Sequence, residues 1–280
     1  MKQFRIKISS RVWTRSIASL LVPALVLGLA VSSAALEFPH RKDYPTVPPI
    51  ESEALFKQYE VDKAIIVDVR SSIEYDVIHP EGAVHIPLSS KNFTERVKEL
   101  SSFNPDKKIA FYCNGITCLK SYEATRKALA AGINNCYVYD AGIPIWASTY
   151  PKKTLLLGKE LVDPDKQLIP KAAFKKKCLP IKKFKSTTKS KNSLVIDVRD
   201  HIQRSAKIKG LKKVKKIPLD KFIPNFVEKK VKRDKTLLIF DQVGKQVRWL
   251  EYYLVANGYK NYYFLAGGAT SVLKAQKYKK

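Results

Sequence analysis

The sequence is poor in the side chains that most often bind metal ions, with four histidines and four cysteines in 280 residues. Their spacing does not match that of a metal site. We therefore expect no metal and no cofactor, and we expect His79 and His85 to be ordinary turn and strand residues. The four cysteines are Cys113, Cys118, Cys136 and Cys178.

The first 36 residues lack any acidic side chain and contain five basic ones. From Ile17 to Leu36 the chain is almost wholly apolar and ends in small residues. This pattern predicts a signal peptide over residues 1–35. An uncleaved N-terminal anchor is the alternative, because the apolar run is nearly long enough to span a bilayer. No cysteine follows the run, which argues against lipid attachment. Both alternatives predict an exported protein, periplasmic or secreted.

Acidic residues are scarce in the whole chain, 25 against 52 basic residues, which gives a net charge of +27. Residues 151–280 carry about +24 of this charge, and such a surface attracts anions. The simplest explanation is a solvated basic surface. The alternatives are docking of residues 171–280 to an anionic membrane surface or an acidic protein, or attraction of anionic substrates. The predicted export argues against nucleic acid as a partner.

Residues 108–132 contain the pattern that is most informative about function. A short apolar run predicts a buried strand that ends just before Cys113, and a helical pattern follows the loop after it. Loop amides and a helix N-terminus form a site for anions. That environment favours the thiolate, which is the nucleophilic form of cysteine. We interpret Cys113 as a catalytic residue; the alternative is a buried structural cysteine beside a turn.

An internal repeat divides the remaining chain into two domains. Residues 192–200 repeat the strand that ends at Arg70, and residues 258–268 repeat residues 132–142. Apolar strands alternate with amphipathic helices in both halves, which predicts an α/β fold with parallel sheets flanked by helices. We expect domains at 45–150 and 171–280, joined by a linker at 151–170. In the second copy, Asp241 stands where Cys113 stands in the first.

Four segments in the same order resemble the rhodanese (sulfurtransferase) family. They are Asp68-Val69-Arg70 at a strand end, the segment from His79 to Pro87, the loop after Cys113, and the segment from Val138 to Trp146. The resemblance implies two rhodanese-like domains in tandem. The second is expected to be inactive, because a carboxylate cannot accept a sulfane sulfur to form a persulfide.

The resemblance also implies a reaction and a site. Cys113 would take a sulfane sulfur from a donor such as thiosulfate and pass it to cyanide or a thiol, a covalent mechanism in two steps. Asp68 and Arg70 would support the base of the loop. The expected substrate-binding groups are the loop amides and the cation that closes the loop, from Asn114, Gly115, Ile116, Thr117, Cys118, Leu119 and Lys120.

The loop after Cys113 is about two residues longer than the usual rhodanese loop, and Lys120 takes the place of the closing arginine. Lysine is a point charge rather than a bidentate fork. A wider loop leaves the donor open between thiosulfate, a bulkier persulfide, a polythionate and a tetrahedral oxyanion. Two other classes of function also stay open: a non-catalytic binding module for an anionic partner, and a thiol–disulfide or oxyanion-reducing enzyme that uses Cys113 and Cys118.

The cysteines allow more than one pairing in an oxidising compartment. A disulfide between Cys113 and Cys118 would lie within the loop, and short, exposed bridges of this kind are labile. Cys118 is then either a resolving thiol or a small apolar side chain that fills the loop. A second bridge, between Cys136 and Cys178, would join the two domains.

Overall fold

The structure is a computed structural model, and it describes residues 37–206 and 208–277. The predicted signal peptide or anchor lies outside these residues. The described residues belong to one compact unit. Among them, no helix combines the length and the apolar character needed to cross a bilayer.

The first domain is built on a four-stranded sheet in which all neighbouring strands are parallel. The strand order is β3 (Val84–His85), β1 (Ala64–Asp68), β4 (Lys108–Tyr112) and β5 (Cys136–Tyr139). In β1 and β4, Asp68 lies opposite Tyr112 in the register. The two central strands therefore end side by side, and the residues that follow them meet at one edge of the sheet.

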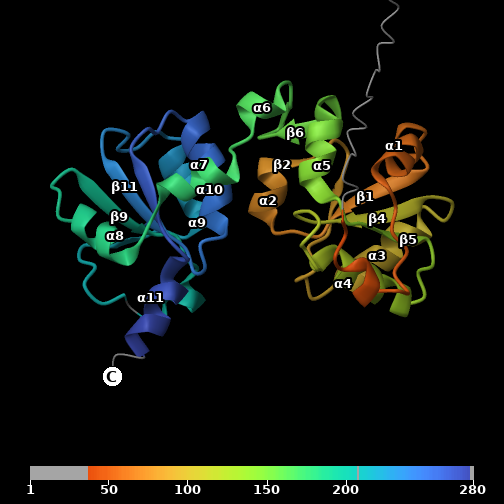
Figure 1. Ribbon diagram of the computed structural model, residues 1–280, viewed down its shortest axis with the longest axis horizontal. Helices are drawn as coiled ribbons and strands as arrows, with labels where there is room; N and C mark the ends of the chain where they lie inside the picture. Colours follow the sequence, from red (N-terminus) through yellow and green to blue (C-terminus); the bar gives the residue numbers. More distant parts are fainter. Residues whose placement is uncertain (1–36, 207, 278–280) are drawn as a thin grey trace, which may run out of the picture. The chain divides into compact units, whose positions relative to one another are not determined.

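Helices cover both faces of this sheet (Figure 1). Residues alternate between the faces because successive strand side chains point to opposite sides. Ala110 and Tyr112 pack with one group of helices, whereas Ile109 and Phe111 pack with the other. The first group is α1 (Ser52–Glu60), α2 (Ser72–Val77) and α5 (Gly142–Thr149), and the second is α3 (Phe93–Ser102) and α4 (Lys120–Ala130). A single turn of 3-10 helix, η1 (Arg41–Asp43), precedes them.

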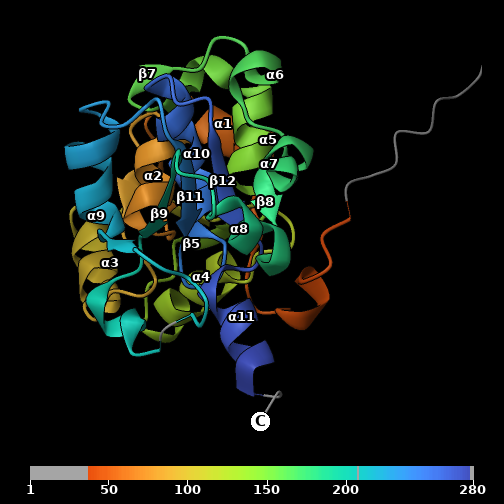
Figure 2. The same cartoon turned by 90° about the vertical axis from the view of Figure 1, so that its left-hand side faces the viewer.

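The second domain has a five-stranded parallel sheet. Its order is β10 (Lys215–Lys216), β9 (Ser193–Asp197), β11 (Thr236–Phe240), β12 (Tyr262–Leu265) and β8 (Cys178–Leu179). Figure 2 shows β9, β11, β12 and β8 side by side in this order. The predicted repeat is therefore confirmed in the fold, because β9 and β11 pair as β1 and β4 do.

Helices also cover both faces of the second sheet. On one face lie α7 (Lys171–Lys177), α9 (Leu219–Phe222) and α10 (Gln246–Ala256); on the other lie α8 (Ile181–Thr187) and α11 (Gly268–Lys277). Two short helical turns, η3 (His201–Arg204) and η4 (Ile223–Val227), complete the domain. The helix α10 packs against α2 of the first domain.

The segment 151–170, expected to be a linker, carries secondary structure of its own. It contains η2 (Pro151–Lys153), β6 (Thr154–Leu156), β7 (Lys159–Glu160) and α6 (Pro164–Gln167). The strand β6 pairs antiparallel with β2 (Ile78–Pro80) and with β7 in a small third sheet. Residues 154–160 are thus anchored to the first domain by strand pairing.

Candidate active site

The loop that follows β4 starts at Cys113 and ends at Leu119, and α4 begins at Lys120. Cys113 is only 1% exposed, whereas Cys118 is half-buried and Asn114 and Thr117 are exposed. The loop turns back on itself, because the Cys118 N–H donates a hydrogen bond to the Gly115 carbonyl at 2.8 Å. The predicted strand–loop–helix arrangement is therefore present.

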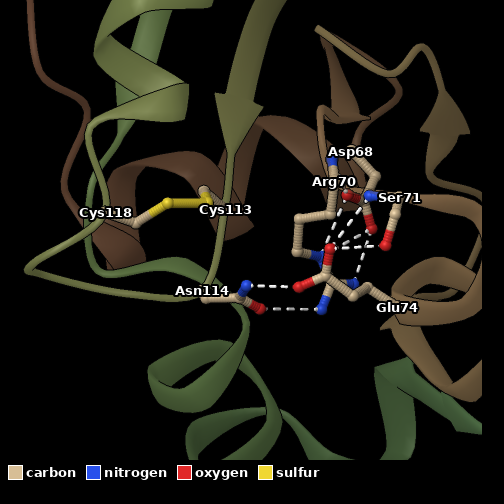
Figure 3. The surroundings of a disulfide bond; sticks show 7 residues. All are labelled: Asp68, Arg70, Ser71, Glu74, Cys113, Asn114 and Cys118. Carbon is tan, nitrogen blue, oxygen red and sulfur yellow. Dashed lines mark hydrogen bonds and ion pairs between the residues drawn. A yellow bond between two sulfur atoms is a disulfide. The ribbon is translucent and has the colours of Figure 1, made fainter. Parts of the chain in front are cut away.

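A disulfide joins Cys113 and Cys118, whose Cα atoms are 6.2 Å apart (Figure 3). Of the two pairings considered from the sequence, this is the one that the structure contains. Cys136 in β5 and Cys178 in β8 are free, so the alternative bridge between the domains, which the sequence left open, is not formed. In this oxidised state the Cys113 sulfur is not a nucleophile, and only reduction of the disulfide would release its thiol.

Asp68 and Arg70 form a fully buried ion pair below the loop. The Arg70 Nη2 lies 2.6 Å from Asp68 Oδ2 and also donates to the Ile78 carbonyl at 2.6 Å. The Tyr112 hydroxyl donates a hydrogen bond to the same carboxylate. Burial lowers the pKa of Arg70, but Tyr112 and Asp68 outweigh this effect and raise the net pKa. The guanidinium is thus a fixed charge at the base of the loop.

Asn114 connects this ion pair to the loop (Figure 3). Its Nδ2 donates to Glu74 Oε1 at 2.6 Å, and its Oδ1 accepts from Arg70 Nη1 at 3.3 Å. Both ends of the amide are therefore engaged, so the side chain positions the loop. Its predicted contribution to substrate binding rests on its backbone N–H.

Glu74 was missed by the sequence analysis, although a signal for it exists. Its Oε2 accepts hydrogen bonds from the Ser71 hydroxyl at 2.6 Å and from the Ser71 N–H at 3.0 Å. The bond from the Ser71 N–H belongs to a capping box at the start of α2. The pattern Ser71-x-x-Glu74 is the sequence signature of that box. Burial raises the pKa of Glu74, but hydrogen bonds from Ser71 and Asn114 outweigh burial and lower it overall.

Gly142 supports the loop from the other side. Its φ is +64°, and a Cβ atom there would lie 2.5 Å from the Gly115 nitrogen and 2.6 Å from the Cys113 oxygen. The next residue, Ile143, donates its N–H to the Cys113 carbonyl at 3.0 Å. The second domain repeats this arrangement with Gly268 at φ +60°, and Ala269 bonds the Asp241 carbonyl. Only glycine allows this close approach of two backbones.

The equivalent loop of the second domain contains its own anion. The Asp241 carboxylate is buried and accepts hydrogen bonds from the Gly244 N–H at 2.5 Å and the Gln246 N–H at 2.7 Å. Burial raises the pKa of Asp241, and these hydrogen bonds act in the opposite direction. The amides of this second-domain loop thus form a nest, a concave set of N–H groups that binds an anion. In the second domain, that nest is filled by a side chain.

A cleft of about 380 Å³ lies beside the half-buried sulfur of the disulfide. Asn114, Thr117 and Cys118 of the loop line it. Phe174, Trp249 and four cationic side chains from the second half of the chain also line it: Lys171, Lys175, Lys245 and Arg248. None of the four cations forms an ion pair with an acidic side chain in the described part of the chain. One carboxylate, that of Glu74, also lines the cleft, so its lining carries four cations against one anion.

The other residues predicted to bind substrate, Gly115, Ile116, Leu119 and Lys120, are not among those that line this cleft. Lys120 is exposed at the start of α4 and does not line the cleft. His79 in β2 and His85 in β3 both stack on the ring of Tyr75, as expected of structural residues. In residues 37–206 and 208–277, no three histidine, cysteine, aspartate or glutamate side chains form a group that could hold a metal ion.

The model of the rhodanese-like domain matches residues 51–149 and 181–275, one match in each half. The chain belongs to the rhodanese-like family. The two matches include both loops, the one with Cys113 and the one with Asp241. The predicted tandem arrangement of rhodanese-like domains is therefore confirmed.

Relatives of this rhodanese-like chain include proteins with different names. The tRNA uridine(34) hydroxylase of Buchnera aphidicola is 36% identical over 98 residues, which are 34% of this chain and 29% of that protein. The thiosulfate sulfurtransferase GlpE of Pseudomonas syringae is 25% identical over 113 residues, 40% of this chain and 96% of that enzyme. A crystal structure of thiosulfate sulfurtransferase from Pseudomonas aeruginosa is 17% identical, with a TM-score of 0.35, and covers 82% of this chain and 45% of that one.

Proposed function

We propose that the protein is a sulfurtransferase that carries sulfane sulfur on Cys113. In the first step, the Cys113 thiolate attacks the outer sulfur of the donor. The donor's S–S bond breaks, its electron pair leaves with sulfite or a thiolate, and Cys113 becomes a persulfide. In the second step, an acceptor thiol or cyanide takes the outer sulfur and Cys113 is released as thiolate.

The observation that carries this proposal is the pair of equivalent loops. In the second domain, amides after position 241 bind a carboxylate that the chain supplies itself. In the first domain, the same position holds a cysteine. Amides arranged in this way stabilise a thiolate and a persulfide anion, because both develop negative charge at that position.

The cleft supports an anionic donor or acceptor. Its cations Lys171, Lys175, Lys245 and Arg248 attract negative charge toward the loop. Thiosulfate, a polythionate and an anionic persulfide all meet this requirement. We propose that the basic second domain, inactive in sulfur chemistry, contributes to catalysis by gathering such anions. Docking to an anionic membrane or an acidic protein is the alternative use of its charge.

We also keep export as a proposal, based on residues 1–36. Rhodanese-like relatives include a named tRNA hydroxylase, but the predicted export places this chain away from tRNA. The disulfide of the loop favours one further candidate, a thiol–disulfide enzyme that needs both Cys113 and Cys118. Sulfur transfer should survive the change Cys118→Ser, whereas a purely dithiol reaction should not.

The test is the intact mass of the reduced protein, freed of reductant, before and after thiosulfate. A gain of one sulfur atom by Cys118→Ser, absent from the Cys113→Ser, Cys118→Ser double variant, supports the proposal. A gain with inorganic polysulfide alone means that the longer loop has changed the donor. No gain with either donor would refute the transferase and leave the binding module or the dithiol enzyme.

A second set of variants tests the cleft. The double variant Lys245→Gln, Arg248→Gln should need a several-fold higher donor concentration for half-maximal sulfur loading, and added salt should reduce the difference. The matched control Lys212→Gln, Lys213→Gln removes the same charge from the second domain away from the cleft. Equal effects of the two pairs would mean that only net charge matters.

A further inference from the structure

The two sulfur atoms of the loop differ in access to solvent. Cys113 is 1% exposed, while Cys118 is half-buried and lines the cleft. The loop nevertheless places the Cys118 Sγ within bonding distance of the Cys113 Sγ. Any persulfide on Cys113 therefore forms beside a second thiol of the same loop.

We propose that Cys118 resolves the Cys113 persulfide by releasing sulfide and forming the disulfide seen in the structure. This step rests on the proposed sulfur transfer to Cys113. It gives the protein a second activity, the reduction of sulfane sulfur to hydrosulfide. The disulfide is then a stage of the reaction cycle rather than a structural bridge.

The step balances in atoms and electrons. The Cys118 sulfur attacks the Cys113 Sγ, and the bond between Sγ and the outer sulfur breaks. The outer sulfur leaves as hydrosulfide with the electron pair and with the proton that Cys118 gives up. One sulfane sulfur is reduced by two electrons, and two cysteines are oxidised to one disulfide. Attack at Sγ follows from the geometry, because Sγ is the atom that Cys118 reaches in the structure.

The different exposure of the two cysteines also determines which sulfur an external thiol attacks when it reduces the disulfide. An external thiol reaches Cys118 first, since this residue lines the cleft and Cys113 is buried. Thiol–disulfide exchange then expels Cys113 as a thiolate into the loop amides and leaves the external thiol on Cys118. A second external thiol releases Cys118. The cations of the cleft favour an anionic thiol as this co-reactant.

A single-turnover experiment tests the proposal. Reduced, reductant-free protein is mixed with excess thiosulfate, and hydrosulfide, free thiols and intact mass are followed together. We expect one hydrosulfide per wild-type chain, the loss of two thiols and no lasting mass gain. Cys118→Ser should keep one sulfur atom and release no hydrosulfide. A Cys178→Ala variant, which removes a free cysteine from another sheet, should behave as the wild type.

The outcomes separate this inference from the function on which it rests. If Cys118→Ser gains sulfur and the wild type also keeps it, the transferase stands and the resolving role is refuted. If the wild type and Cys118→Ser release hydrosulfide equally, the resolving role is refuted as well. If neither protein takes up sulfur, with thiosulfate or with inorganic polysulfide, both proposals fall. Far-UV circular dichroism and a Cys118→Ala variant exclude misfolding as the cause.

The site of external attack gives a second readout. Oxidised wild-type protein is treated with a limiting amount of glutathione, quenched in acid and mapped by peptide mass. We expect the mixed disulfide on Cys118. A mixed disulfide on Cys113 would contradict the order of exchange that the exposures predict.

Discussion

The change Gly142→Ala should damage both stability and sulfur loading, because the added methyl group meets the backbone of the active loop. The residue has φ +64°, a conformation that costs a side chain about 1–2 kcal/mol. The Cβ would also lie 2.5 Å from the Gly115 nitrogen, so the loop has to move. Overpacking of this kind costs a further ~1–3 kcal/mol.

Two other glycines serve as matched controls. Gly132 has φ +83° with no atom within 4 Å of an added Cβ, so Gly132→Ala should lose only the conformational part. Gly268 repeats the close approach in the inactive domain, 2.6 Å from the Gly244 nitrogen. Gly268→Ala should therefore match Gly142→Ala in lost stability and match the wild type in sulfur loading.

The assay is urea unfolding of each variant, combined with the rate at which Cys113 gains sulfur from thiosulfate; for the second measurement every variant and its reference carry Cys118→Ser, so that the added sulfur is retained. A shift of about 1 Å in a reacting group can reduce a rate roughly 100-fold, and we expect an effect of this order for Gly142→Ala alone. Equal destabilisation by Gly142→Ala and Gly132→Ala would refute the argument from close approach. Equal loss of loading in Gly142→Ala and Gly268→Ala would refute the assignment of the active loop.

Three further predictions concern pH, labelling and the inactive loop. Hydrogen bonds hold the pKa of Glu74 below its usual 4.5. Ionised Glu74 therefore stabilises the fold fully above pH 4.5, and this stabilisation is lost as the pH falls through the lower pKa of the folded state. Urea unfolding of Glu74→Gln should lack this part of the acid dependence, and an unchanged pH profile would contradict the prediction. Burial raises the pKa of Cys136 to about 12 and of Cys178 to about 11. Iodoacetamide at about pH 8 should therefore quickly label two cysteines of the reduced native protein and none of the oxidised protein. Fast labelling of a third cysteine, detected by mass, would show that burial does not protect Cys136 and Cys178. Asp241→Ala leaves two N–H groups without their acceptor and should lose ~1–3 kcal/mol of stability in urea without loss of sulfur loading, whereas Asp241→Asn keeps an acceptor oxygen and should lose less.

Much of the architecture follows from the sequence because local patterns and the repeat agree. The runs that end at Asp68 and at Asp197 are short, apolar and followed by Val-Arg, and both form central parallel strands. Segment 151–170 was harder to predict. Its prolines suggested a linker, but β6 depends on pairing with β2, about 75 residues earlier in the chain.

Residues of the candidate site were predictable where the residue type and its position after a strand are enough, and less so where the role depends on contacts between distant segments. Cys113 could be found from its position after a strand. The role of Asn114 could not, because it arises from Arg70 and Glu74, which are distant in sequence. The cationic wall of the cleft also joins residues far apart in the chain, from Lys171 to Arg248. The lysine clusters in the sequence predict a positive surface, but they do not predict that it lies at the cleft.

The carboxylate of Asp241 determines whether anions from solution can bind to the amides of the second loop. Because the side chain is attached to the nest that binds it, it acts there as a ligand at an effective concentration on the order of millimolar or more. A sulfur anion in solution would have to displace a ligand that never diffuses away. Under the proposed function, anions attracted by the basic half would therefore meet Cys113 rather than the amides of the second loop.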